Sequence, residues 1–128
     1  MSLRSPLARA VARGSAKAGV HHWWVQRLTA AALVPLAVWF VVSILALPSL
    51  DYVTVTAWMG QGSTAVLLIL FVLTATWHSQ LGVRVVVEDY VHGAGMKAVT
   101  LAVVAYAHVL IAAASVFAIL KVALGGAA

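Results

Sequence analysis

The chain has 128 residues, of which 64% are hydrophobic and only 9% are charged, and its mean hydropathy is +1.05. Soluble proteins average about 25% charged residues, so this composition excludes a soluble globular domain. The net charge is +5, and the absence of cysteine excludes disulfides and thiolate metal sites.

Three uncharged apolar runs dominate the sequence, at residues 28–47, 64–83 and 98–120. Each reaches or approaches the roughly 20 residues that a helix needs to cross a bilayer. We therefore expect an all-α membrane protein with one three-helix transmembrane domain over residues 1–128, leaving no room for a soluble catalytic domain. The predicted parts are a basic arm at residues 1–18 and spans at about 26–47, 63–89 and 97–121.

Basic residues are distributed unevenly around these spans. Residues 48–62 contain no Lys or Arg, whereas the other side of the predicted membrane carries Arg4, Arg9, Arg13, Lys17, Arg27, Arg84 and Lys97. Because cytoplasmic segments collect Lys and Arg, this pattern predicts a cytoplasmic N-terminus and a C-terminus on the opposite side. Membrane topology explains the positive charge, so we expect no nucleic-acid partner.

The first span begins with Trp23-Trp24 and Arg27, which is typical of a membrane interface. Two interpretations of Arg27 are open: an anchor that reaches lipid headgroups, or a cation that points into the bundle toward an anionic group. Pro35 is expected to kink this span. The following segment, residues 48–52, is predicted to be a short turn.

The second span contains His78, and a histidine inside a membrane is costly and therefore a candidate functional residue. On an ideal helix Asp89 lies about 20° around the axis from His78 and roughly 16 Å along it, whereas Tyr90 lies about 120° around. Gly82, one turn after His78, leaves space in which a flat group could lie. From these residues alone, His78 is either a haem-iron ligand or a buried hydrogen-bonding residue. We expect a glycine near residues 93–95 to end the helix in a left-handed conformation.

The third span is rich in alanine, which favours close helix packing. His108 is expected at the same depth as His78, because the second and third spans are antiparallel. It is either a structural residue or a second ligand to the same haem. His21, His22 and His92 fall at the predicted membrane surfaces.

Two motifs resemble a known family, the small hydrophobic anchor subunits of succinate dehydrogenase (respiratory complex II). The first motif lies in the second span and consists of a histidine, a glycine one turn later and an Asp-Tyr pair: His78-x-x-x-Gly82 and Asp89-Tyr90. The second motif opens the first span: Gly19-Val20-His21 and Arg27-x-Thr29. The resemblance covers about residues 19–121.

The resemblance implies specific roles for five residues. His78 would be one axial ligand of a b-type haem, with the other supplied by a partner membrane subunit. Arg27 would approach the haem propionates, and His21 would lie near that surface. Tyr90 would hydrogen-bond a quinone carbonyl, and Asp89 would belong to the quinone site as a candidate for proton delivery.

It also implies partners and a location. The partners are a second hydrophobic anchor subunit, an iron–sulfur subunit and a flavoprotein. FAD and the iron–sulfur clusters would lie only in these partners. Succinate oxidation would therefore need no catalytic residue in this chain. The expected location is the bacterial inner (cytoplasmic) membrane, as a multi-pass protein. Alternatives are a fumarate reductase anchor and a haem-free structural anchor. A small transporter subunit is disfavoured because no internal repeat is seen.

Overall fold

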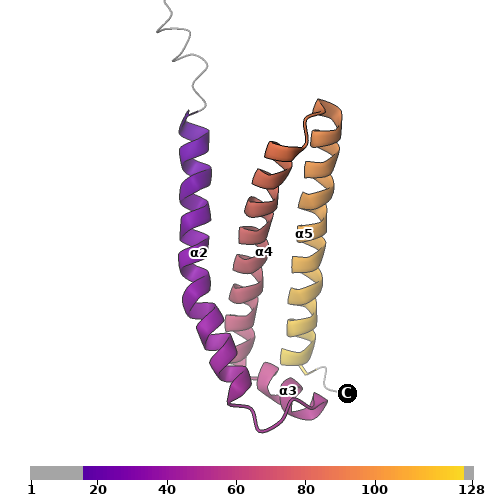
Figure 1. Ribbon diagram of the computed structural model, residues 1–128. Coiled ribbons are helices and arrows are strands. Elements are labelled where there is room, and N and C mark those ends of the chain that lie inside the picture. The colour runs from indigo at the N-terminus through magenta and orange to yellow at the C-terminus, as the bar shows by residue number, and fades with distance from the viewer. Residues whose placement is uncertain (1–15, 126–128) are drawn as a thin grey trace, which may run out of the picture.

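The computed structural model describes residues 16–125, and every regular element in that part of the chain is a helix (Figure 1). The helices are α2 (Ala16–Leu45), α3 (Tyr52–Met59), α4 (Gly62–Tyr90) and α5 (Ala94–Ala123). Three of them, α2, α4 and α5, are long and apolar enough to cross a membrane. The predicted all-α fold with three spanning helices is confirmed, whereas the predicted arm lies almost entirely outside the described residues.

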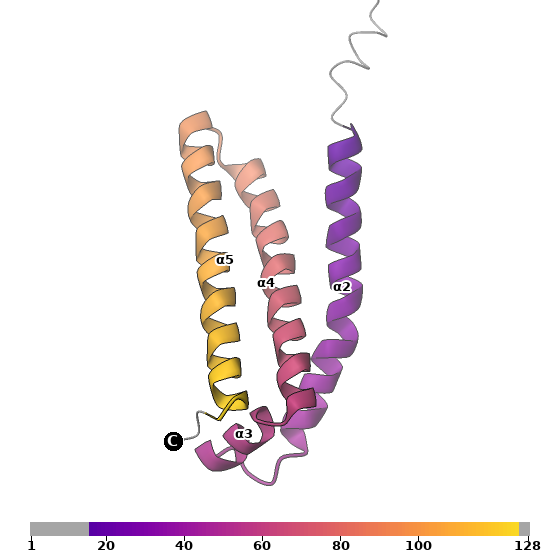
Figure 2. The same ribbon diagram turned by 180° about the vertical axis from the view of Figure 1, so that it is seen from behind.

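α4 is the central helix of the bundle. It packs against α2 on one side and against α5 on the other, while α2 and α5 do not pack on each other within residues 16–125. Figures 1 and 2 show α4 between them. The start of α2, the end of α4 and the start of α5 share one end of the molecule, and α3 lies at the other. Polar side chains on α4 can therefore find partners on two neighbouring helices.

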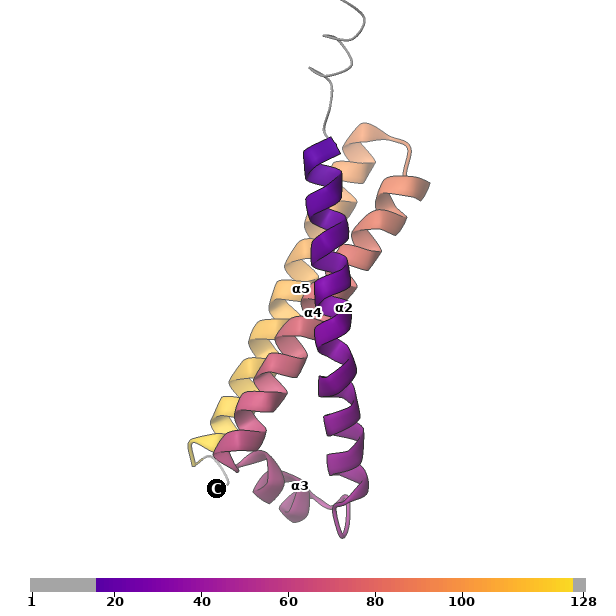
Figure 3. The same cartoon turned by 90° about the vertical axis from the view of Figure 1, so that its left-hand side faces the viewer.

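α2 changes direction near its middle, and Pro35 lies inside it (Figure 1). Proline removes one helical hydrogen bond and its ring crowds the preceding turn, which is the usual cause of such a kink. In Figure 3, α4 and α5 run side by side while α2 crosses them at an angle. The first turns of α2 consequently diverge from α4.

The small core lies near α3. The buried residues there are Ala65, Leu68 and Ile119, and the partly buried side chains packed on them include Trp39, Phe40, Trp58 and Met59. The rings of Trp39 and Trp58 stack with their centres 6.1 Å apart. The packing of these large aromatic side chains against one another stabilises this end of the bundle.

The helix α3 was not predicted. Residues 48–51 form an irregular connection, and Tyr52 is already the first residue of a helix. Asp51 caps this helix by accepting a hydrogen bond from the backbone N–H of Thr54 at 2.9 Å. Asp is among the best N-cap residues because its carboxylate pairs with an otherwise unsatisfied donor. The capped turn starts a two-turn helix that brings Trp58 to the core.

The prediction that a left-handed glycine ends α4 is wrong. α4 ends because Val91 adopts an extended conformation, with φ −97° and ψ 107°. Gly93 is also extended, with φ −73° and ψ 121°. Within residues 16–125, a positive φ occurs only at Gly125, after α5.

Most large apolar side chains point outward. The buried hydrophobic residues of the described part are only four, Ala65, Leu68, Val87 and Ile119, whereas α2 and α5 expose long rows of Val, Leu, Ile and aromatic residues. Such outer faces are compatible with lipid or with the helices of other membrane subunits. The bundle has little core of its own.

Candidate functional site

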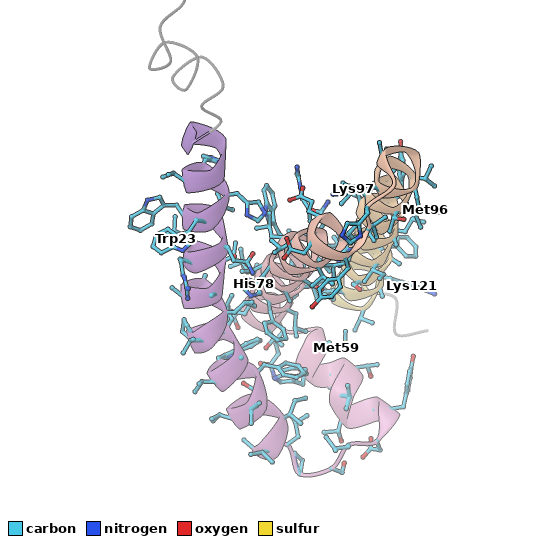
Figure 4. The ribbon with its side chains drawn as sticks, turned by 45° about the horizontal axis from the view of Figure 1, so that its top comes forward. Trp23, Met59, His78, Met96, Lys97 and Lys121 are labelled. Atoms are coloured by element: carbon cyan, nitrogen blue, oxygen red, sulfur yellow. The ribbon has the colours of Figure 1, made fainter. Side chains whose placement is uncertain are left out.

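His78 lies on α4 and points toward α2 (Figure 4). Its Nδ1 atom is 2.9 Å from the hydroxyl oxygen of Thr29, and both residues are partly buried. Thr29 Oγ1 is also 2.8 Å from the carbonyl oxygen of Val25 and 3.1 Å from that of Gln26. The candidate ligand is thus fixed to the neighbouring helix through one of its two ring nitrogens.

The other ring nitrogen of His78, Nε2, makes no hydrogen bond to any residue in the part of the chain that the structure describes. An imidazole with one nitrogen held and the other open is the arrangement that metal ligation requires. No group of three or more His, Cys, Asp or Glu residues within residues 16–125 could hold a metal ion. The open Nε2 of His78 is a donor of the kind that binds haem iron.

Gly82 lies one turn from His78 and faces Gln26 on α2. A Cβ atom added at Gly82 would be 3.8 Å from Gln26 Nε2, which is ordinary van der Waals distance. The carboxamide oxygen of Gln26 is buried and has no hydrogen-bond partner among the described residues. The open space that we expected beside Gly82 is thus partly filled by Gln26, which sequence reasoning did not identify.

His108 lies at the depth of His78, on the other side of α4. Its Nε2 is 3.2 Å from the hydroxyl of Ser79, and its Nδ1 is 2.8 Å from the carbonyl oxygen of Val104. A carbonyl can only accept, so Nδ1 carries the proton and Nε2 accepts from Ser79. With both nitrogens engaged, the geometry favours the structural interpretation of His108 over ligation within the chain.

Arg27 lies on a different side of α2 from Thr29. Its side chain is exposed, and its guanidinium carbon is 5.6 Å from the centre of the Trp23 ring. Arg27 and Thr29 are two positions apart, so their side chains lie about 160° apart around the helix axis. Figure 4 shows that Trp23, which Arg27 contacts, points away from α4. The structure does not bring Arg27 together with His78, and its role toward haem propionates stays a prediction.

A cavity of about 490 Å³ lies where α2 diverges from the last turns of α4. Its lining combines polar and apolar side chains: Gly19, His21, His22, Val25, Trp77, Leu81, Arg84 and Glu88. Arg84 and Glu88 form an exposed ion pair at 2.7 Å. His21 is thus placed at this cavity, whereas His78 does not line it.

Asp89 and Tyr90 form the last turn of α4. Both are exposed, Tyr90 by 78%, and neither lines a cavity described above. The Tyr90 hydroxyl makes no hydrogen bond to residues 16–125, so it is available to an external acceptor. The described part of this chain does not enclose a quinone by itself.

Comparisons with known proteins agree on one family. Residues 1–120 match the family model described as succinate dehydrogenase/fumarate reductase transmembrane subunit. The succinate dehydrogenase hydrophobic membrane anchor subunit of Rickettsia bellii (strain RML369-C) is 37% identical over 89 residues, covering 69% of this chain and 70% of the relative. That of Paracoccus denitrificans is 31% identical over 121 residues, covering 94% and 93%.

No solved structure matches the chain. The family match spans most of the three-helix bundle, and the curated relative from Paracoccus denitrificans is similar over nearly its whole length. The chain belongs to the family of succinate dehydrogenase/fumarate reductase transmembrane subunits.

Proposed function

We propose that this chain is the hydrophobic membrane anchor of a succinate:quinone oxidoreductase, contributing one axial ligand to haem b and part of the quinone site. The names of its relatives support the anchor role. The observation that carries the haem assignment is the state of His78, with Nδ1 held by Thr29 at 2.9 Å and Nε2 open.

His78 would bind haem iron through Nε2, and the second ligand would come from a partner anchor subunit. A haem bound there supplies a one-electron carrier within the membrane. Arg27 and His21 are proposed for its propionate side. Because Arg27 faces away from α4, its part in this proposal requires the propionates to reach the outer side of α2.

Tyr90 and Asp89 would serve the quinone. A phenol is neutral at pH 7 and can donate a hydrogen bond to a quinone carbonyl oxygen, and a neighbouring carboxylate can pass protons from water. The high exposure of Tyr90 supports a site whose other walls belong to partner subunits, including the iron–sulfur subunit. Electrons would arrive from FAD in the flavoprotein through iron–sulfur clusters, since this chain contains no cysteine ligand.

The direction of the reaction has two candidates. The family description includes both succinate dehydrogenase and fumarate reductase, whereas the curated relatives described above are named succinate dehydrogenase anchors. We therefore propose that the complex oxidises succinate in the cell. We also propose that it is located in the bacterial inner membrane.

The test of this function is replacement of His78 by Leu in the whole complex, purified through the flavoprotein. We expect loss or strong perturbation of the reduced-minus-oxidised haem spectrum. The matched control is His92→Leu, because His92 is exposed in the turn between α4 and α5. An assembled His78→Leu complex with unchanged haem absorption would contradict the ligand assignment and leave His78 a structural, hydrogen-bonding role.

A further inference from the structure

We propose that Thr29 is a positioning residue for His78: its hydroxyl fixes the imidazole tautomer and ring orientation, so that Nε2 is the nitrogen offered to iron. The inference rests on the proposed function, in which His78 binds haem. It concerns a contact between two helices, since residues 29 and 78 are 49 positions apart.

The three distances around Thr29 Oγ1 determine where the protons lie. The hydroxyl oxygen is 2.8 Å from the carbonyl oxygen of Val25, which is hydrogen-bond distance between two oxygen atoms. A carbonyl has no proton to share, so the only hydroxyl proton of Thr29 must point toward Val25. The carbonyl of Gln26, at 3.1 Å, lies on the same side and shares that proton.

With its proton used, Thr29 Oγ1 can only accept from His78. His78 Nδ1, at 2.9 Å, therefore carries the proton and donates it to the hydroxyl. A neutral imidazole has one N–H, so Nε2 holds the free electron pair that a metal requires. Thr29 thus selects the tautomer that is competent to bind iron through Nε2.

Thr76 shows what this hydroxyl does without a histidine. Its Oγ1 donates to the carbonyl of Val72 at 2.7 Å and lies 3.1 Å from that of Leu73, which repeats the local geometry of Thr29. It makes no hydrogen bond to an imidazole among the described residues. The bond to the carbonyl four residues earlier is therefore an ordinary feature of threonine in a helix, and what distinguishes Thr29 is the second helix on its acceptor side.

Loss of the hydroxyl has a definite expected effect on the iron. A hydrogen bond from Nδ1–H to an acceptor raises the basicity of Nε2 and holds the ring plane. Thr29→Val keeps the shape of the side chain and removes the acceptor. We expect a weaker axial ligand, with less stabilisation of ferric iron, and hence a higher haem midpoint potential and shifted low-spin EPR g values.

The experiment compares four variants in the assembled complex: Thr29→Val, Thr29→Ser, Thr29→Cys and the control Thr76→Val. Haem content per flavin, midpoint potential and EPR spectrum are measured. We expect the wild-type spectrum for Thr29→Ser and Thr76→Val, a shifted spectrum for Thr29→Val, and an intermediate one for Thr29→Cys, because sulfur is a weak acceptor.

Each outcome separates this inference from the proposed function. If His78→Leu removes the haem while Thr29→Val keeps the wild-type potential and g values, the positioning role is wrong and the haem assignment stands. If His78→Leu leaves the haem unchanged, the proposed haem ligation by His78 fails, and with it the role of Thr29 toward iron. If Thr29→Val does not assemble, the near-isosteric Ser and Cys variants decide: different spectra support the role, and identical ones overturn it.

Discussion

Lys97 in the first turn of α5 donates a hydrogen bond from Nζ to the backbone carbonyl oxygen of Glu88, in the last turn of α4, at 2.7 Å. The last carbonyls of a helix have no partner inside it and carry the negative end of the helix dipole. A cation placed there satisfies one of them across the three-residue connection between the helices. Lys97 thereby holds the turn of α4 that presents Asp89 and Tyr90.

We predict that Lys97→Ala loosens the end of α4. The lost contact is worth about 0.3–1 kcal/mol locally, so amide protection at residues 88–93 should fall a few-fold, and KM for quinone should rise. Hydrogen exchange and quinone-linked kinetics measure the two effects, with dye-linked succinate oxidation unchanged. The control is Lys121→Ala, because Lys121 is exposed in the last turn of α5. Equal changes in both variants would contradict a capping role for Lys97.

Tyr90→Phe tests the quinone assignment. The Tyr90 hydroxyl has no partner within residues 16–125 and its side chain is 78% exposed, so the substitution should leave folding of this chain intact. We expect slower quinone reduction, since the donor to the carbonyl oxygen is lost, and normal succinate oxidation with a soluble dye. A parallel decrease in both assays would argue that Tyr90 serves assembly and not quinone.

The sequence predicted the three long helices because hydropathy and length alone determine them. It did not predict α3, since Tyr52–Met59 is too short for a periodic signal and depends on the Asp51 cap and on the packing of Trp58. We expected a left-handed glycine to end α4. Instead, Lys97 of the next helix donates a hydrogen bond to the backbone carbonyl oxygen of Glu88 in the last turn of α4.

Only part of the candidate site was predicted, because the rest depends on contacts between helices. His78 stands out because any histidine inside an apolar run does. Its partner Thr29 and the neighbour Gln26 lie on another helix, and their pairing depends on how α2 crosses α4, which one sequence does not specify. The bond between Ser79 and His108 was not predicted, because it depends on how α5 is rotated against α4, which one sequence does not specify.

At Gly82 we expect a small side chain to be tolerated and a large one to be disruptive. A Cβ there meets Gln26 Nε2 at 3.8 Å, so Gly82→Ala should retain haem and assembly. Gly82→Leu must displace Gln26 beside His78, and overpacking of this kind typically costs about 1–3 kcal/mol. We expect reduced haem content and lower thermal stability. Gly95→Leu is the control, because nothing lies within 4 Å of that position, and a Gly82→Leu complex equal to this control would contradict the close approach.

His108 and Ser79 should be coupled to each other and not to haem. Their bond joins α4 to α5 at 3.2 Å, and hydrogen bonds between membrane helices contribute about 0.6 kcal/mol on average. A double-mutant cycle of His108→Leu and Ser79→Ala, measured by unfolding of the complex, should give a coupling energy near that value. The haem spectrum should be unchanged in all three variants; loss of the bis-ligand signal in His108→Leu would identify His108 as a ligand.

Asp51 gives a pH dependence whose sign can be worked out. The hydroxyl of Ser49, then the backbone N–H and hydroxyl of Thr54, donate to the Asp51 carboxylate and lower its pKa from 3.8 to about 2. A pKa lowered in the folded state means that the cap stabilises α3 fully above about pH 4 and loses this effect as the pH falls through 2. Amide protection factors at residues 54–56 should therefore be constant between pH 5 and 8 and lower at pH 2.5.

The Asp51 variants separate charge from hydrogen bonding. Asp51→Asn retains an acceptor without the ionisable group, so its protection factors should not depend on pH across the same range. Asp51→Ala should lower protection at every pH, because the N–H of Thr54 loses its only side-chain acceptor in the described structure. Trp58 fluorescence follows the same change at the core, where Trp58 stacks on Trp39 with ring centres 6.1 Å apart. If Asp51→Asn remained as sensitive to acid as the wild type, some other group would have to be the origin of the pH dependence.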